Sequence, residues 1–435
     1  MSGFVRRNWF RQVLGRRVRG GALASGLLAS VSCSDDSDDR WLITATRIYV
    51  APESPPIDDG WVLVTAGKIE AVGASTAAPP RGVRIHSACS GGVVAAGFQN
   101  SHVHLATPAF EQAAIRPQLE LREGLSQMLT SFGFTTAVDT GSILVNTLAL
   151  RQRVEGGEVP GPAILTAGLP LYPENGIPFY LREQPAEILR QLPQPADAAE
   201  AVAVVAENFA LGANGTKLFV ATPQGGGEIK RMAAQIARAA AEETHRRGGL
   251  VMAHPTDAQG VRDAVDAGVD VIVHTTIDPA GSAWSDDLIR DMVARHVSVV
   301  PTLKLWGYEL DRQGAAADVR EGANDAARRQ VEAFAKAGGQ LLFGTDVGYM
   351  EDFDPTDEYV LMARAGLSPM QILASLTTAP AARWLEGERR GRVAPGLAAD
   401  LVVLDGDPAA EVENFADVRC TIRGGHEVFT RASSR

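Results

Sequence analysis

A histidine pair, His102 and His104, is the first feature of the sequence that points to chemistry. If this segment is a β-strand, residues i and i+2 project from the same face, roughly 6–7 Å apart. Two imidazoles at that spacing can bind one metal ion. A lone pair of this kind also arises by chance, so the interpretation depends on further ligands elsewhere in the chain.

Three more residues with metal-binding side chains each end an apolar, strand-like segment. They are His254, His274 and Asp346. Taken singly, each has an ordinary structural explanation, but imidazole nitrogen and carboxylate oxygen are typical ligands of zinc. Together with the histidine pair they predict a metal centre.

Lys217 is unusual because it lies between apolar neighbours in another strand-like segment. Burying an ammonium group is costly unless the group is paired or chemically changed. One interpretation is a structural ion pair, with Asp139 as a candidate partner. As an ammonium the side chain cannot bind a metal, so a place in the metal centre would require modification.

The elements that would position these residues alternate between apolar strands and Ala-rich helices. The expected strands are 97–105, 134–140, 162–168, 215–220, 249–254, 269–275, 297–303 and 340–346. The expected helices include 111–131, 197–211, 227–247, 258–267, 285–295 and 318–337. This pattern predicts a (β/α)8 barrel, in which catalytic groups gather at the C-terminal ends of the strands.

Short strand-like segments with Pro, Gly and Asp turns stand at both ends of the chain, in residues 41–94 and 389–430. We expect them to be two parts of one β-sandwich, with the barrel, residues 95–388, inserted between them. The predicted fold class is therefore α/β: a (β/α)8 TIM barrel with a small composite β-sandwich domain formed by both chain ends.

The motifs and their order resemble the amidohydrolase superfamily, especially its imidazolonepropionase-like and prolidase-like branch. The resemblance covers roughly residues 41–430. The segments that carry it are 97–104, the strand of Lys217, 253–255, 269–274, 344–346 and 396–404.

The resemblance implies a binuclear metal centre with zinc as the expected metal. His102, His104 and Asp346 would hold one divalent ion, and His254 and His274 the other. A CO2-derived carbamate on Lys217 would bridge the two.

The same resemblance implies hydrolysis of an amide or peptide-like C–N bond by a metal-bridging hydroxide. Asp346 would be the catalytic proton shuttle to the leaving nitrogen.

Aromatic and basic residues in the segments after strands three, seven and eight are candidates for substrate binding, because those loops line the mouth of the barrel. The candidates are Tyr180, Lys304, Trp306 and Tyr349. The aromatic residues favour an apolar or aromatic small-molecule substrate, although loop aromatics are as often simple packing, and Lys304 could hold a substrate carboxylate.

Three alternatives remain open. A mononuclear deaminase uses a similar ligand set, and Asp257 stands where deaminases place a glutamate, but Lys217 would then have no role. The same metals could hydrolyse an ester or a lactone. A non-catalytic binding lipoprotein is the third alternative, against which the intact ligand set argues.

The composition is that of a globular protein, with 45% hydrophobic and 21% charged residues. A net charge of −11 argues against nucleic-acid or anionic-membrane binding as the main activity. We expect a small-molecule substrate and no nucleic acid, with a homo-oligomer as one option.

Residues 1–33 have the features of an export signal. Six arginines and no acid occupy residues 1–20, and an Ala/Gly/Leu-rich stretch leads to Cys33. Arg6-Arg7 begins a segment similar to a twin-arginine signal, and Ser30 to Cys33 resembles a bacterial lipobox. We expect an exported protein, either periplasmic or anchored in the envelope by a lipid on Cys33.

Cys89 and Cys420 are the two cysteines outside this signal. They could form a disulfide in an oxidising compartment, but we favour two buried free thiols.

Overall fold

The computed structural model describes residues 40–277 and 283–432. The predicted export signal, including Cys33, lies outside the described residues. Within them, no helix combines the length and the apolar character needed to cross a bilayer.

Seven buried parallel strands form the centre of the larger part of the chain. One sheet has the order β6–β7–β8 and another the order β9–β12–β13–β14. Their bounds are β6 Phe98–Val103, β7 Phe134–Asp139, β8 Ala163–Thr166, β9 Gly215–Phe219, β12 Leu250–His254, β13 Val271–Val273 and β14 Ser298–Val300. Such continuous apolar strands suit a parallel sheet that is covered on both faces.

The eighth expected strand, residues 340–346, forms isolated bridges rather than a regular strand. Its Leu342 N–H donates to Val299 O of β14, and its Phe343 O accepts from Ser101 N of β6. An isolated bridge between Leu171 and Leu218 joins the segment after β8 to β9. These links connect the two parallel sheets in a mixed α/β fold, so the predicted α/β class is confirmed.

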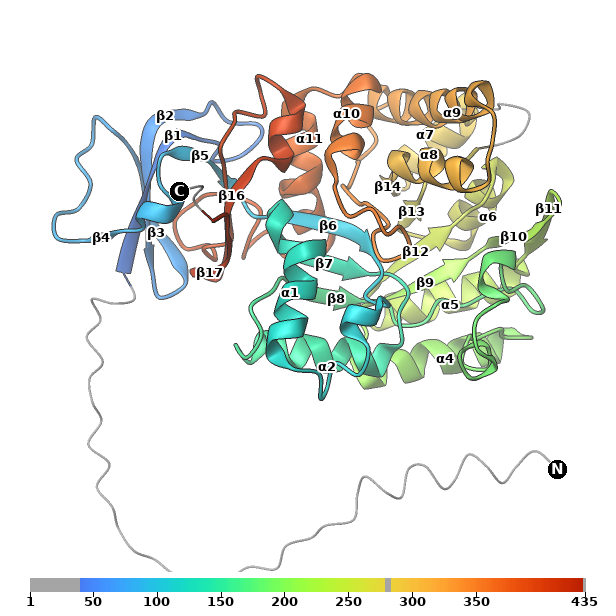
Figure 1. Ribbon diagram of the computed structural model, residues 1–435. Coiled ribbons are helices and arrows are strands. Elements are labelled where there is room, and N and C mark those ends of the chain that lie inside the picture. Colours follow the sequence, from blue (N-terminus) through green and yellow to red (C-terminus); the bar gives the residue numbers. More distant parts are fainter. Residues whose placement is uncertain (1–39, 278–282, 433–435) are drawn as a thin grey trace, which may run out of the picture. The chain divides into compact units, whose positions relative to one another are not determined.

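Helices surround these strands (Figure 1). They are α1 Gln118–Met128, α2 Leu144–Glu155, α3 Ala186–Leu189, α4 Ala198–Leu211, α5 Ala234–Arg246, α6 Ala258–Ala267, α7 Asp286–Ala294, α8 Leu303–Arg312, α9 Ala317–Lys336, α10 Thr356–Arg364, α11 Pro369–Leu376 and α12 Thr378–Arg383. Short 3-10 turns are η1 Ser87–Cys89, η2 Pro108–Phe110, η3 Thr130–Phe132, η4 Phe179–Leu181 and η5 Val412–Ala416.

Two expected elements begin or end elsewhere. The helix expected at 227–247 begins only at Ala234, because a hairpin of β10 (Ala221–Gly225) and β11 (Glu228–Arg231) precedes it. The strand expected at 297–303 ends at Val300, because Pro301 removes a backbone donor and Thr302 is left-handed.

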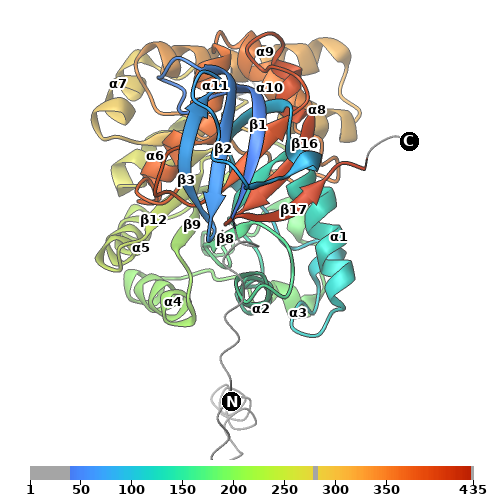
Figure 2. The same ribbon diagram turned by 90° about the vertical axis from the view of Figure 1, so that its left-hand side faces the viewer.

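The two ends of the chain share one sheet. Its order is β17–β16–β15–β5–β1–β2–β3, with β4 paired to β1. In Figure 2 the blue strands from the N-terminal half lie beside the red strands from the C-terminal end. The bounds are β1 Arg40–Ile48, β2 Ile57–Thr65, β3 Lys68–Ala74, β4 Arg84–Ile85, β5 Gly92–Ala96, β15 Leu401–Leu404, β16 Val418–Arg423 and β17 His426–Thr430.

This pairing corrects the predicted sandwich. Over residues 40–96 and 401–430 the strands make a single eight-stranded sheet, and β5 lies between β1 and β15. A turn-rich series of short strands does not reveal its pairing, because the alternation of side chains is the same in one sheet as in two.

A disulfide between Cys89 and Cys420 corrects the expectation of free thiols. The two cysteines are fully buried, 331 residues apart in sequence, with their Cα atoms 5.5 Å apart. Cys89 ends η1 and Cys420 lies in β16. The bond therefore fastens the N-terminal part of the sheet to the C-terminal part.

Removing this bond is expected to destabilise the protein. A Cys89→Ala/Cys420→Ala double variant should lose roughly 2–5 kcal/mol of unfolding free energy, because the denatured chain is no longer closed into a long loop. Urea denaturation of both proteins measures the difference. Equal midpoints, or alkylation of both cysteines in unreduced denatured wild type, would contradict the disulfide.

Candidate metal centre

The six residues singled out in the sequence converge at the C-terminal ends of the parallel strands. The His102 ring centroid lies 5.1 Å from that of His104 and 4.8 Å from that of His274. The ring centroids of His254 and His274 are 4.9 Å apart. The four imidazoles thus form a continuous group although they come from three separate strands.

Asp346 completes the group on the side of the first histidine pair. Its Oδ1 atom lies 2.9 Å from His102 Nε2 and 3.0 Å from His104 Nε2. This oxygen is buried, and among the described residues it has these ion-pair contacts but no contact with hydrogen-bond geometry. Ligand atoms of His102, His274 and Asp346 all lie within 4.8 Å of one another. Such a buried, convergent set of nitrogen and oxygen donors fits a divalent metal ion.

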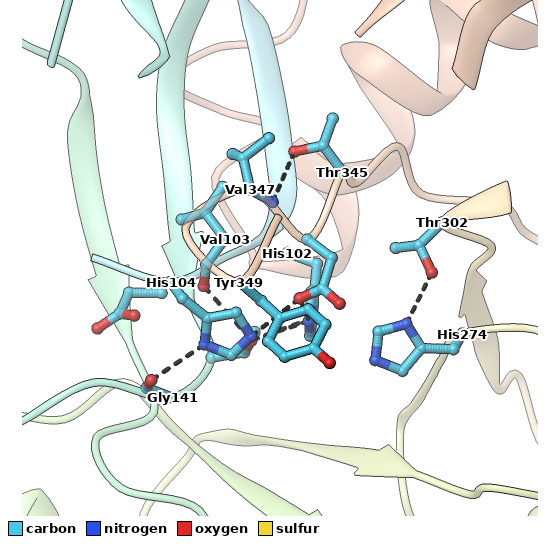
Figure 3. A network of polar contacts seen from close by, with 12 residues as sticks. His102, Val103, His104, Gly141, His274, Thr302, Thr345, Val347 and Tyr349 are labelled. Atoms are coloured by element: carbon cyan, nitrogen blue, oxygen red, sulfur yellow. Dashed lines mark hydrogen bonds and ion pairs between the residues drawn. The ribbon is translucent and has the colours of Figure 1, made fainter. Parts of the chain in front are cut away.

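Three residues hold the imidazole rings from behind. Gly141 O accepts from His104 Nδ1 at 3.0 Å, and Thr302 Oγ1 is hydrogen-bonded to His274 Nδ1 at 2.7 Å, as Figure 3 shows on either side of the site. Thr140 Oγ1 is 3.1 Å from His102 Nδ1. Partners on one ring nitrogen fix the tautomer and leave the other nitrogen for a metal.

Sequence reasoning did not find these supporting residues, although a signal exists. Thr140 and Gly141 follow β7 directly, and Thr302 comes two residues after β14. Polar residues and carbonyl groups at such strand ends share the mouth with the ligands.

Strained backbone accompanies the site. His274, Thr302 and Asp346 have φ values of 77°, 44° and 61°, a left-handed region that non-glycine residues rarely adopt. Gly344, two residues before Asp346, lets this segment approach β14 closely, since a Cβ there would lie 2.4 Å from Val300 Cγ1. Strain of this kind persists where the surrounding structure enforces it, typically at functional sites.

Lys217 lies on β9 with about 1% of its surface exposed. Burial lowers the pKa of its amine to about 7, although the negative charge of Asp346 acts to raise it. Its Nζ is 5.6 Å from the centre of the Phe219 ring, which stacks on His254. The amine therefore stands close to the histidine group and titrates near neutrality.

The alternative ion pair with Asp139 does not form. The Asp139 carboxylate is satisfied by hydroxyl donors, from Ser142 at 2.5 Å and from Thr147 and Thr166 at 3.0 Å. Among the described residues, no carboxylate lies within salt-bridge distance of Lys217.

Burial keeps the deeper imidazoles neutral. It lowers the pKa of His102 and His254 to about 3 and that of His274 well below its usual value. Burial also opposes ionisation of Asp346, but the neighbouring His102 holds the pKa of this carboxyl well below its usual range. Neutral imidazoles and an ionised carboxylate are the forms that bind metals.

The aromatic candidates divide into two groups. The Tyr180 and Tyr349 rings are 5.5 Å apart, and the Tyr349 hydroxyl donates to Glu309 at 3.0 Å. Trp306 is buried, donates from Nε1 to Thr275, and has its ring centroid 6.3 Å from that of His274. Figure 3 shows Tyr349 in front of His102 and His104, so Tyr349 and Trp306 lie beside the histidine group and Tyr180 packs against Tyr349.

Lys304 is not brought to the site. Its Nζ pairs with Asp352 at 2.7 Å and donates to Asp354 O at 2.6 Å. It lines a different surface cavity, together with Tyr308 and Arg364. Because Lys304 follows the seventh expected strand, the sequence predicted it near the mouth of the barrel. In the structure it lies in the first turn of α8, and its side chain points away from the histidine group toward Asp352 and Asp354.

Comparison with known proteins agrees with this fold. The amidohydrolase family matches residues 93–428. The chain belongs to the amidohydrolase family and is a hydrolase by that membership, as the resemblance of its motifs predicted.

Solved structures share the fold. A Xaa-Pro dipeptidase with bound methionine superposes with a TM-score of 0.76 at 19% identity, over 90% of this chain and 100% of that one. A putative prolidase from Bifidobacterium longum gives 0.74 at 24% identity, over 91% and 96%. Ochratoxinase from A. niger gives 0.74 at 16% identity, over 91% and 96%. These neighbours include prolidases, the branch expected from the sequence.

An uncharacterized protein of Mycobacterium bovis is 29% identical over 184 residues, which are 40% of this chain and 46% of that protein. The chain thus spans about half the length of the curated relatives it matches.

Proposed function

We propose that this protein is a binuclear, metal-dependent amidohydrolase that cleaves an amide or peptide-like C–N bond of a small molecule. The observation that carries the proposal is the convergence of four imidazoles, one carboxylate and one buried lysine at the ends of the parallel strands. The proposal also takes the fold to be a complete eight-stranded barrel in which residues 340–346 act as the last strand.

Each residue has a distinct role in this proposal. His102, His104 and Asp346 would hold one ion, and His254 and His274 the other. Lys217, as a carbamate, would supply the oxygens between them. Bound divalent ions, zinc in the first instance, would lower the pKa of water and polarise the scissile carbonyl.

Asp346 would also move the proton. The carboxylate is buried among the imidazoles, with Oδ1 at 2.9 Å from His102 Nε2 and 3.0 Å from His104 Nε2, and from this position it would take a proton from attacking water. It can then deliver that proton to the leaving nitrogen.

The aromatic side chains around the site favour an apolar or aromatic substrate. Tyr180 and Tyr349 would contact it on one side and Trp306 on the other. Structural relatives are described as a Xaa-Pro dipeptidase and an ochratoxinase, and the name of the first agrees with a peptide-like bond.

The deaminase alternative is disfavoured by Asp257. Its Oδ1 caps α6 by accepting from Gly260 N at 2.7 Å, and its Oδ2 pairs with Arg231 at 2.6 Å. A carboxylate engaged in this way is a poor proton-transfer group. An ester or lactone substrate remains the second candidate, because the same residues suit both bond types.

The function is tested by assaying purified protein against dipeptides, N-acyl amino acids, cyclic imides and lactones, before and after metal removal. We expect hydrolysis of at least one amide class, loss on chelation and recovery on metal addition. Deamination without amide hydrolysis, or activity that survives complete metal removal, would reject the proposal.

Carbamate formation should depend on pH through Lys217. CO2 adds only to the neutral amine, and a pKa near 7 means that this form grows as pH rises through 7. At fixed dissolved CO2, reactivation of metal-free protein by metal should accelerate from pH 6 and level off above about 8. A rise that continues through pH 9 would indicate an ordinary lysine, whose pKa is about 10.4.

We also propose export, with a mature chain that begins near Cys33 and is periplasmic or lipid-anchored. The disulfide supports this location, because such bonds persist in oxidising compartments. N-terminal sequencing of protein from its host is the test, and a cytosolic chain that retains Met1 or Ser2 would contradict it.

A further inference from the structure

The first turn of α8 departs from the usual way in which a helix begins. Thr302 occupies the N-cap position, where a threonine hydroxyl normally accepts a hydrogen bond from the first turn. Its side chain makes no such bond. The hydroxyl is instead bonded to His274 Nδ1 at 2.7 Å, and the backbone adopts a left-handed conformation that is unfavourable for a β-branched residue.

A side chain from another helix takes over the capping. Glu358, on α10, accepts from Leu303 N at 2.9 Å and from Lys304 N at 2.8 Å, one bond to each carboxylate oxygen. Its side chain is fully buried. These two N–H groups belong to the first turn of α8, which has no partner for them within the helix.

We propose that Glu358 is a positioning residue for the metal centre: by capping α8 from outside, it leaves the Thr302 hydroxyl available to orient His274. This inference rests on the proposed function, because it assigns His274 to a metal. The hydrogen bonds of the Glu358 carboxylate go to the backbone of α8, not to a proposed metal-binding side chain.

The electrostatics of Glu358 fit a specific role. A buried carboxylate is costly without hydrogen bonds, and burial raises the pKa of Glu358 to about 7 although the two backbone N–H groups favour the anion. The positive end of the α8 dipole stabilises the charge further. A serine or threonine at the N-cap would satisfy one of these groups without a buried charge. The chain has such a threonine, but its hydroxyl serves His274.

The test measures metal affinity in Glu358→Gln, Thr302→Val and the double variant, by competition with a chelator. Glutamine offers one acceptor where Glu358 offers two. Glu358→Gln and Thr302→Val should each weaken metal binding about tenfold, as is typical for residues that orient metal ligands. Thr302→Ser, which keeps the hydroxyl, should bind nearly as tightly as wild type.

The double variant distinguishes positioning from general stability. If Glu358 acts through Thr302, Glu358→Gln should weaken binding little further once Thr302 is valine. The matched control is Asp357→Asn, which alters the neighbouring α10 carboxylate and should leave affinity unchanged. Visible absorption of the cobalt-substituted protein should change in Glu358→Gln and not in the control.

A second measurement needs no variant. Coupling is reciprocal, so metal loading of the wild-type protein should slow hydrogen exchange at the Leu303 and Lys304 amides. Unchanged exchange there, or wild-type affinity in a folded Glu358→Gln protein, would overturn the inference. If the wild-type protein itself binds no metal, the proposed function fails instead.

Discussion

Lys217→Ala is expected to lose at least one metal ion and to lower turnover by about 10³-fold or more, since metal charge stabilisation is worth several kcal/mol. The side chain is buried beside the histidine group without a carboxylate partner among the described residues. It is therefore suited to becoming an anionic carbamate. Metal analysis and steady-state rates measure both effects.

Lys217→Arg separates the bridging role from a structural one. Guanidinium keeps the positive charge but cannot accept CO2, so this variant should fail as badly as alanine. Short carboxylates added to Lys217→Ala should restore part of the rate by supplying the missing oxygens. Lys336→Arg, on the exposed face of α9, is the control and should behave as wild type. Normal metal content and turnover in Lys217→Arg would refute the bridge.

Asp346→Asn is expected to lower turnover by roughly 10²–10⁴-fold, the range for loss of a proton-transfer group. Asparagine keeps the shape but removes both the anionic ligand and the proton acceptor. The buried Oδ1 that faces two imidazole nitrogens is the atom affected. Rates at saturating metal isolate the proton-transfer part of the loss from the metal-binding part.

The control for this variant is Asp287→Asn, a surface carboxylate on α7 paired with Arg290, which should leave turnover unchanged. If Asp346→Asn retained more than about a tenth of wild-type turnover with full metal content, another residue would have to move the proton.

The positions of the ligands could be predicted because buried parallel strands leave a clear pattern in the sequence. A continuous apolar run is a buried strand, and the first polar residue at its end faces the mouth. His274 follows β13 directly and His254 is the last residue of β12. Residues 340–346, the eighth expected strand, could be predicted for the same reason, although their backbone forms isolated bridging contacts rather than a regular strand.

Long-range pairing could not be predicted in the same way. Nothing local in the sequence reports that Cys89 faces Cys420, or how the strands of the two chain ends pair with one another. The capping of α8 by Glu358 is a tertiary contact of the same kind, and Lys304 was misplaced because a single helical turn decides which way it points.

The most direct test of a binuclear centre held by these six residues is the metal content of active protein. Elemental analysis of the purified hydrolase, after removal of loosely bound metal, should give about two divalent ions per chain. Replacement of His102 or His254 with alanine should reduce that number. One ion or none in fully active wild-type protein would contradict the account, and one ion would favour the mononuclear alternative.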